Sequence, residues 1–200
     1  MIKLFVSWKE WEEASYAIRA QIDKVLLDDL TNCFKYAQEK HGSQTRPGGE
    51  PYYRHLIQVF EVLFSGVGSR VSAELKASIL HDVVEDTGTS IHEIKEEFGD
   101  EVARLVNAVT IPAETPGQTK AETKALYLDA LLKAPKDVRC LKLSDRYGNV
   151  QRLDLHPRKE KQKSYFKETV EKVIPMAYDL PYFQGLFSEW EKWFATVVPK

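Results

Sequence analysis

The feature that most constrains this chain is the spacing of its apolar residues, which follows the 3.6-residue period of an α-helix along most of its length. Apolar residues recur three and four positions apart, for example at Ala121, Ala125 and Leu128. No convincing stretch alternates apolar and polar residues in the way of a half-buried strand. Since each such helix must bury its apolar stripe against its neighbours, the pattern predicts an all-α fold, a single compact helical bundle.

Capping boxes, in which Ser or Thr precedes Glu by three positions, mark three expected helix starts. They are Ser7 with Glu10, Ser90 with Glu93, and Thr119 with Glu122. The first predicts a long helix running towards Leu30, and a second helix should follow over about 28–41, where Gly42 ends it. Gly99 should end a short helix over 91–98, and Asp100 is expected to cap the next one.

The same periodicity predicts the remaining helices and the loops between them. We expect helices over about 52–64, 72–84, 119–132, 137–153, 158–177 and 187–197. Glycine and proline mark loops at 42–51 and 111–118. With no repeat or linker composition, residues 1–200 are interpreted as one domain, with a core over about 28–180 and helical extensions at both ends.

Charge and cysteine content narrow the functional classes. A formal net charge of −2 provides no global field for nucleic acid or an anionic membrane, so we expect neither as a partner. The apolar run Ile2–Val6 is too short for a signal-peptide core, and no window approaches the length of a membrane span. Cys33 and Cys140 lie in helical patterns and are interpreted as reduced core thiols. These features predict a cytoplasmic protein.

The segment His81-Asp82-Val-Val-Glu85-Asp86 carries four ionisable side chains directly after an apolar stretch. On a helix, Asp82 would lie close to both Glu85 and Asp86, and like charges three or four positions apart are destabilising. A carboxylate beside a core costs still more unless it is compensated. A bound cation removes both penalties. The alternative is a solvated acidic helix end, with His81 as an ordinary core histidine.

Two further residues favour the metal interpretation. His55 lies near the start of the preceding expected helix, and Asp145 lies on a later one, so that three helices could bring His55, His81–Asp82 and Asp145 to one point. Two imidazoles and two carboxylates form a mixed nitrogen and oxygen site, which suits manganese, iron or zinc better than calcium. Such a site leaves positions open for water and a substrate oxygen, as hydrolysis of a phosphoester requires.

Three ordered blocks also carry a resemblance to a known family. They are Arg46-x-x-Gly-x-Pro51-Tyr-x-x-His55, His81-Asp-x-x-Glu-Asp86-Thr, and Asp145-Arg-x-x-Asn149. Together they resemble the HD-domain superfamily. They are most similar to the hydrolase domain of the Rel/Spo homologues and to their single-domain relatives, the small alarmone hydrolases. The resemblance extends from about Leu30 to Ala177.

The resemblance implies the following roles. His55, His81, Asp82 and Asp145 bind manganese, or another divalent transition metal in its place. Glu85 and Asp86 position or deprotonate the attacking water, a role within reach of a carboxylate one turn beyond the ligands. Arg46 and Asn149 contact a small-molecule nucleotide substrate. The family's reaction removes the 3′-pyrophosphate of guanosine tetra- or pentaphosphate.

Pro47, Gly148 and Arg152 depart from the residues usual in the family at positions near the nucleotide base and sugar. The metal chemistry is therefore the part of the resemblance that this sequence carries most fully, and two alternatives to the alarmone hydrolase stay open. One is an HD-type nucleotidase or phosphodiesterase acting on another nucleotide, such as a nicotinamide dinucleotide phosphate. The other is a catalytically silent HD module that binds a nucleotide as a sensor.

Other noticeable residues are given structural roles. His41 lies next to Gly42 at an expected helix end, where it would favour the helix dipole. The closing aromatics Trp190, Trp193 and Phe194 form a stripe expected to pack on the bundle. If that stripe were too exposed for a monomer, a homodimer surface would be the next interpretation.

Overall fold

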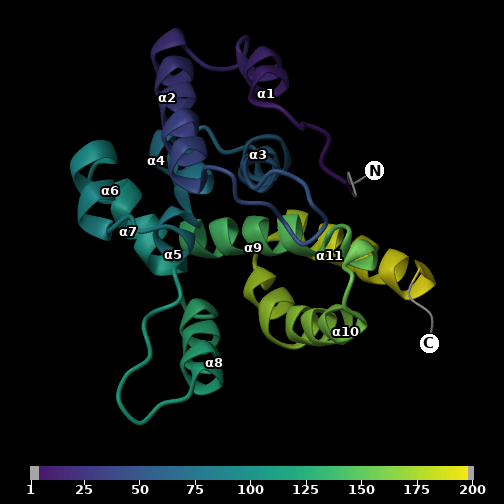
Figure 1. The fold of residues 1–200 in the computed structure, drawn as a ribbon. Helices are drawn as coiled ribbons and strands as arrows, with labels where there is room; N and C mark the ends of the chain where they lie inside the picture. The colour runs from purple at the N-terminus through teal and green to yellow at the C-terminus, as the bar shows by residue number, and fades with distance from the viewer. Residues whose placement is uncertain (1–4, 198–200) are drawn as a thin grey trace.

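Helix α9, Lys136–Val150, is the centre of the fold, because every residue from Val138 to Gly148 is buried. Figure 1 shows it crossing the middle of the molecule. It packs against α3 (Tyr53–Glu61), α4 (Ser72–Leu80) and α7 (Asp100–Val109). A helix that is covered on all sides presents its polar side chains to other protein elements, so the charged residues of α9 require partners within the fold.

The structure is a computed structural model that describes residues 5–197, and most of the apolar run at 2–6 lies outside that range. The other helices are α1 (Trp11–Ile18), α2 (Lys24–His41), α5 (Val83–Asp86), α6 (Ile91–Phe98), α8 (Lys120–Leu131), α10 (Lys159–Glu168) and α11 (Pro181–Val197). Shorter 3₁₀ or π turns span Val62–Val67, Leu153–Leu155, Thr169–Val173 and Ile174–Ala177. Between residues 5 and 197 extended pairing is limited to an isolated bridge of Thr45 with Pro51, so the predicted all-α fold is confirmed.

Two of the three capping boxes form as predicted, at Ser90 and at Thr119. The box at Ser7 is wrong, since α1 begins only at Trp11. The Ser7 hydroxyl instead donates to Glu61 Oε1 at 3.0 Å, and the backbone amides of Ser7 and Trp8 each donate to Glu61 Oε2 at 2.8 Å. Glu61 is buried in α3, where an unsolvated carboxylate requires donors, and this requirement outweighs local capping.

Two other expected boundaries are wrong for similarly local reasons. The first helix ends at Ile18 rather than near Leu30, because Asp23 starts a new helix by accepting a hydrogen bond from the Leu26 amide at 2.8 Å. Asp100 is the first residue of α7 and not its cap. Gly99 occupies the cap position with φ 91°, a conformation that favours glycine.

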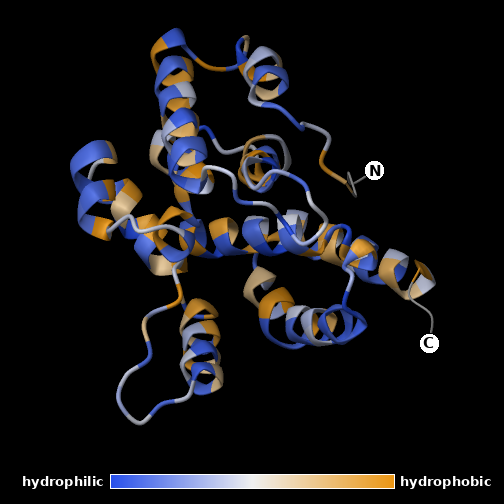
Figure 2. Cartoon of the chain, in the orientation of Figure 1, coloured by the Kyte–Doolittle hydropathy of each residue, from blue (hydrophilic) through white to orange (hydrophobic). Residues whose placement is uncertain are grey.

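The closing aromatic stripe packs on the bundle as predicted. Trp190 and Phe194 are buried, and the Trp190 indole donates to the Val150 carbonyl at 2.7 Å. Helix α11 begins at Pro181, earlier than expected. In Figure 2 hydrophilic colour covers most of α10, while α11 alternates between apolar and polar residues.

The two cysteines, Cys33 and Cys140, are free and buried, as predicted. Among the described residues, none of the helices combines the length and the apolar character needed to cross a membrane.

Candidate metal centre

Four side chains from three parts of the chain converge beside α9. His55 comes from α3, His81 and Asp82 from the junction of α4 with α5, and Asp145 from α9. One ligand atom of each lies within 4.8 Å of the others. His55 Nε2 lies 3.3 Å from both Asp82 Oδ2 and Asp145 Oδ1, and His81 Nε2 lies 2.9 Å and 3.7 Å from the same two oxygens. The structure thus brings together all four residues that the sequence singled out as metal ligands.

The orientation of the two imidazoles suits a cation. His81 Nδ1 donates to the Ser78 carbonyl at 2.9 Å, which leaves Nε2 of the neutral ring with a lone pair directed at the cluster. His55 Nε2 lies only 3.2 Å from His81 Nε2. Burial acts to lower the pKa of His81, but the Asp82 and Asp145 carboxylates outweigh it and raise the pKa to about 10. The cluster therefore favours a positive charge at its centre, and its donors fit a divalent metal.

His81 and Asp82 lie at a break between two helices. The sequence predicted one helix over 72–84, but α4 ends at Leu80 and α5 begins at Val83. Adjacent residues of an unbroken helix point in directions about 100° apart, so His81 and Asp82 would diverge. In the turn between α4 and α5, His81 has φ −56° and ψ −33° and Asp82 has φ −99° and ψ −6°, and both side chains reach the cluster.

His55 lies so close to α9 that the facing residue must be small. A Cβ atom added to Gly148 would lie 3.0 Å from His55 Nδ1 and 3.1 Å from its Cε1. Such contacts are tighter than ordinary packing, so a side chain at this position would displace the imidazole. Gly148, one of the positions that depart from the family pattern, therefore leaves the space that the His55 imidazole occupies.

Asp145 is held on both of its oxygens. Lys142 Nζ lies 2.9 Å from Oδ2, and the Asn149 amide donates to Oδ1 at 2.6 Å. Burial acts to raise the pKa of Asp145, but Lys142 and the two imidazoles keep the pKa well below its usual range. Asp145 is thus a carboxylate that the fold keeps ionised, as a metal ligand must be.

The two expected substrate-binding residues lie together at the edge of this cluster. The Arg46 guanidinium donates to Asn149 Oδ1 at 3.0 Å and to Gln58 Oε1 at 3.2 Å. Since Asn149 in turn bonds Asp145, a continuous chain of hydrogen bonds joins Arg46 to the proposed ligands.

Glu85 and Asp86, the expected catalytic acids, lie in α5 one turn beyond Asp82 and are exposed. Glu85 Oε2 accepts a hydrogen bond from the Ile111 amide at 3.1 Å, which ties it to the start of the 111–118 loop. Partial loss of hydration raises the pKa of Glu85, although the Ile111 amide and Lys142 act in the opposite direction. The carboxyl group is therefore adjacent to the cluster and is a better proton acceptor than an ordinary glutamate.

Sequence reasoning missed three residues around the cluster. The Tyr52 hydroxyl donates to Asp82 Oδ2 at 2.6 Å, and Lys142 pairs with Asp145. Tyr52 and Lys142 each lie three positions before a ligand, so helical spacing from His55 and Asp145 was a usable signal. His41 was assigned to the helix end. Its buried ring also stacks on Tyr52, with ring centroids 4.4 Å apart.

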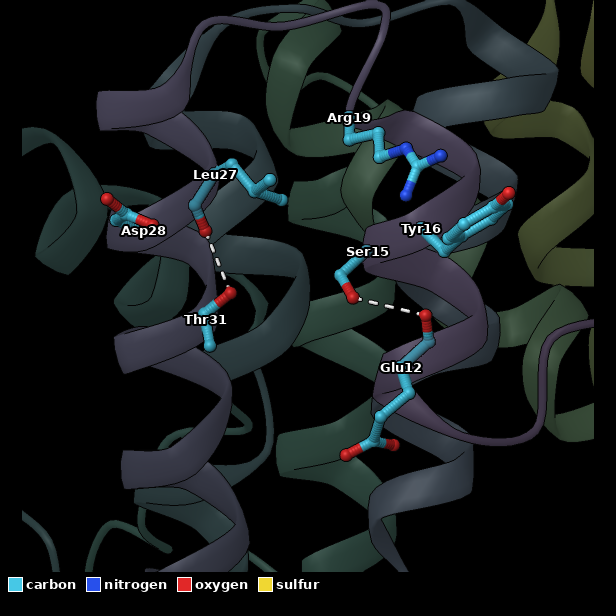
Figure 3. Close-up of a pocket in the computed structure, with 7 residues that line it drawn as sticks. All are labelled: Glu12, Ser15, Tyr16, Arg19, Leu27, Asp28 and Thr31. Carbon is cyan, nitrogen blue, oxygen red and sulfur yellow. Dashed lines mark hydrogen bonds between the residues drawn. The ribbon is translucent and has the colours of Figure 1, made fainter.

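A separate open pocket lies between α1 and α2 (Figure 3). The Ser15 hydroxyl donates to the Glu12 carbonyl at 3.2 Å. The Thr31 hydroxyl donates to the Leu27 carbonyl at 2.8 Å and accepts from the Trp11 indole of α1 at 3.1 Å. None of the proposed ligands or catalytic acids lines it. The chemistry of the chain is therefore concentrated at the His55–Asp145 cluster.

Comparison with protein families agrees with this geometry. Residues 33–177, which contain every side chain of the cluster, match the family model described as HD domain. The chain belongs to the HD domain family. Membership of this family implies that the domain binds a divalent metal. The four converging side chains are donors that could hold it.

Relatives of this HD domain are much longer proteins. A guanosine-3′,5′-bis(diphosphate) 3′-pyrophosphohydrolase of Aquifex aeolicus is 37% identical over 169 residues, which are 83% of this chain and 23% of that protein. A probable GTP pyrophosphokinase of Mycobacterium leprae is 35% identical over 159 residues, 78% of this chain and 20% of that protein. The chain therefore spans about a fifth of the length of these curated relatives.

A solved structure of more similar size also matches. It is described as a metazoan ortholog of SpoT that hydrolyzes ppGpp and plays a role in starvation responses. The sequences are 28% identical, the TM-score is 0.66, and the match covers 84% of this chain and 92% of that chain. The helical arrangement around α9 is thus shared with that protein.

Proposed function

We propose that this HD domain is a manganese-dependent phosphohydrolase that removes the 3′-pyrophosphate of guanosine 3′,5′-bis(diphosphate). The observation that carries the proposal is the convergence of His55, His81, Asp82 and Asp145 within 4.8 Å, with Glu85 one turn beyond Asp82. Two nitrogen and two carboxylate donors suit Mn²⁺ and leave room for water and a phosphate oxygen.

The relatives' names include both a hydrolase and a pyrophosphokinase, but the matched segment supports hydrolysis. Only about a fifth of each long relative corresponds to this chain. The metazoan protein described as hydrolyzing ppGpp is matched over 92% of its chain. The match between this chain and a protein described as hydrolyzing ppGpp therefore covers nearly the whole of that protein.

The residues divide the reaction between them. A divalent cation held by the four ligands would supply Lewis acidity, lowering the pKa of water and polarising the phosphorus centre. Glu85, with its raised pKa, accepts the proton of the attacking water, while the Ile111 amide fixes one of its oxygens at 3.1 Å. Asp86, the next residue of α5, is assigned to positioning that water.

Arg46 and Asn149 provide the polar contacts for the nucleotide. The guanidinium has planar donors suited to a phosphate or a base edge, and Asn149 holds it at 3.0 Å. Because Asn149 also bonds Asp145, substrate contacts at Arg46 are coupled to the position of a proposed ligand.

The test is a substrate screen with purified protein and Mn²⁺. Guanosine tetraphosphate, a nicotinamide dinucleotide phosphate and ordinary mononucleotides are incubated separately, and the products are identified by ion-exchange chromatography and ³¹P NMR. We expect GDP and pyrophosphate from guanosine tetraphosphate, and no product after chelation of the metal. Phosphate release from the dinucleotide alone would indicate the other nucleotidase, and binding without turnover would indicate the sensor module.

A further inference from the structure

A tyrosine outside the expected ligand set contacts one of the ligands directly. The Tyr52 hydroxyl donates to Asp82 Oδ2 at 2.6 Å. The same oxygen lies 2.9 Å from His81 Nε2 and 3.3 Å from His55 Nε2, so it is the Asp82 atom that faces the cluster. We propose that Tyr52 is a positioning residue, which fixes the Asp82 carboxylate for metal binding. This inference rests on the proposed metal-dependent function.

The geometry explains why one hydroxyl matters. The Asp82 carboxylate lies in the turn between α4 and α5, where no regular helix restrains its side chain. A carboxylate oxygen can accept from more than one direction, and a short hydrogen bond to an ionised group is strong. With Tyr52 occupying one direction of Oδ2, another stays directed at the two imidazoles. Hydrogen-bond partners of this kind orient metal ligands and tune metal affinity.

Tyr52 is itself held from several sides. Its ring stacks on His41, with centroids 4.4 Å apart and planes at 19°, and it meets the His55 ring edge-on at 5.8 Å and 78°. Its backbone amide donates to the Gln44 carbonyl at 3.0 Å. The hydroxyl therefore reaches Asp82 from a ring whose plane and backbone are both fixed.

The end of α2 is tied to the same place. His41 Nδ1 lies 2.7 Å from Gln44 Oε1, and the side-chain amide of Gln44 donates to the Asp86 backbone carbonyl at 2.8 Å. His41 is buried, which a residue serving only to cap a helix does not require. The stack of His41 on Tyr52 thus connects α2, the start of α3 and α5 around one carboxylate.

The chain offers a matched control in the next residue. The Tyr53 hydroxyl donates to Glu10 at 2.8 Å, on α1's side of the molecule and away from the cluster. Tyr52→Phe and Tyr53→Phe therefore each remove one hydroxyl that bonds a carboxylate, at adjacent positions. They differ in which carboxylate loses its donor.

The experiment titrates Mn²⁺ into the metal-free full chain and its two variants, followed by calorimetry and by the electron paramagnetic resonance of free Mn²⁺. We expect Tyr52→Phe to bind Mn²⁺ about 10- to 100-fold more weakly and Tyr53→Phe to bind within about twofold of the wild type. The melting temperatures of the metal-free proteins should stay close to one another. Turnover by Tyr52→Phe should recover as Mn²⁺ approaches saturation.

The outcomes separate this inference from the proposed function. If the wild type binds Mn²⁺ and Tyr52→Phe binds it equally well, the role of Tyr52 is wrong while the metal centre stands. An equal loss of affinity in Tyr53→Phe also overturns the role, because the effect would then follow the start of α3 in general. A wild type that binds no Mn²⁺ overturns both proposals.

Discussion

Asp145 and Arg146 are neighbours on α9, yet they direct opposite charges into surroundings of different kinds. Arg146 Nη2 lies 2.6 Å from Glu168 Oε1, and Lys124 Nζ lies 2.6 Å from the other oxygen of Glu168. Tyr165 lies beneath the guanidinium at 5.1 Å. On this side of α9, Glu168 of α10 neutralises Arg146, and Lys124 of α8 pairs with the same carboxylate.

On the Asp145 side, acceptors converge instead. Asp145 Oδ1 lies within 3.7 Å of both imidazole Nε2 atoms, and the Asp82 carboxylate lies on the same centre. The comparison teaches that burial of charge is not in itself a sign of function. A buried charge whose partners are all opposite charges of the chain is structural. Donor atoms that still converge on one point beside such a pair, as they do next to Asp145 and Lys142, indicate a ligand that the chain does not supply.

The largest expected effect is the loss of metal binding and turnover on the Asp145 side of α9. Asp82→Ala should reduce bound manganese from one ion per chain to none, and turnover should fall by at least about 10³-fold, because the Lewis acid is worth several kcal/mol. Elemental analysis after gel filtration, with a turnover assay, measures both. Asp100→Ala is the control, since it removes an exposed carboxylate that pairs only with Lys95 among the described residues. Metal retained in Asp82→Ala would contradict the ligand assignment.

The second effect separates metal binding from catalysis on the same side. Glu85→Gln should keep its manganese and lose turnover by about 10²–10⁴-fold, because the amide cannot accept the proton of water. It keeps an oxygen for the Ile111 amide, so the loop contact is preserved. Metal content and kcat are measured on the same sample. Loss of metal in Glu85→Gln equal to that in Asp82→Ala would show that Glu85 is not a separate catalytic group.

The third expected effect is a loss of stability on the Arg146 side of α9. Arg146→Met leaves Glu168 with Lys124 alone and should lower the free energy of unfolding by about 2–3 kcal/mol. Urea denaturation measures it. Manganese content should stay at that of the wild type. A loss of metal without a loss of stability would reverse the roles that we give to the two sides of α9.

The smallest effect concerns pH. Burial acts to raise the pKa of Glu168, but Arg146 and Lys124 outweigh it and lower the pKa below 4.5, its ordinary value. The stability that Glu168 contributes is therefore fully present above pH 4.5 and is lost as pH falls through the lower folded-state pKa. We expect the difference between wild type and Glu168→Gln, about 1 kcal/mol at neutral pH, to shrink in this acid range. A difference that grows on acidification would contradict the lowered pKa.

The fold was largely predictable because it depends on short-range patterns, and the cluster was predictable because its residues lie in blocks that resemble a known family. Helical periodicity identified most helices. Residue types pointed to His55, His81, Asp82 and Asp145 as candidate ligands, and the resemblance to the HD-domain superfamily implied that they act together. The break between α4 and α5 was not predictable, since neither glycine nor proline marks it. Both α4 and α5 pack against α2, so the break lies within a segment that one neighbouring helix covers.

The contacts that sequence missed join elements far apart in the chain. The Ser7 hydroxyl and amide bond Glu61, which lies 54 positions away, and Tyr52 bonds Asp82 across 30 positions. Local rules assign a serine to a cap and a tyrosine to packing. Only the tertiary arrangement shows which buried carboxylate each residue serves.

Because the His55 imidazole lies against the bare Cα of Gly148, the two positions cannot vary independently. We expect a relative with a larger residue at the equivalent of Gly148 to hold α3 slightly farther from α9 or to rotate its histidine. The separation of these two helices is thus a structural trait by which branches of the family can be sorted. A methyl group gained at position 148 would require the imidazole to move by a few tenths of an ångström.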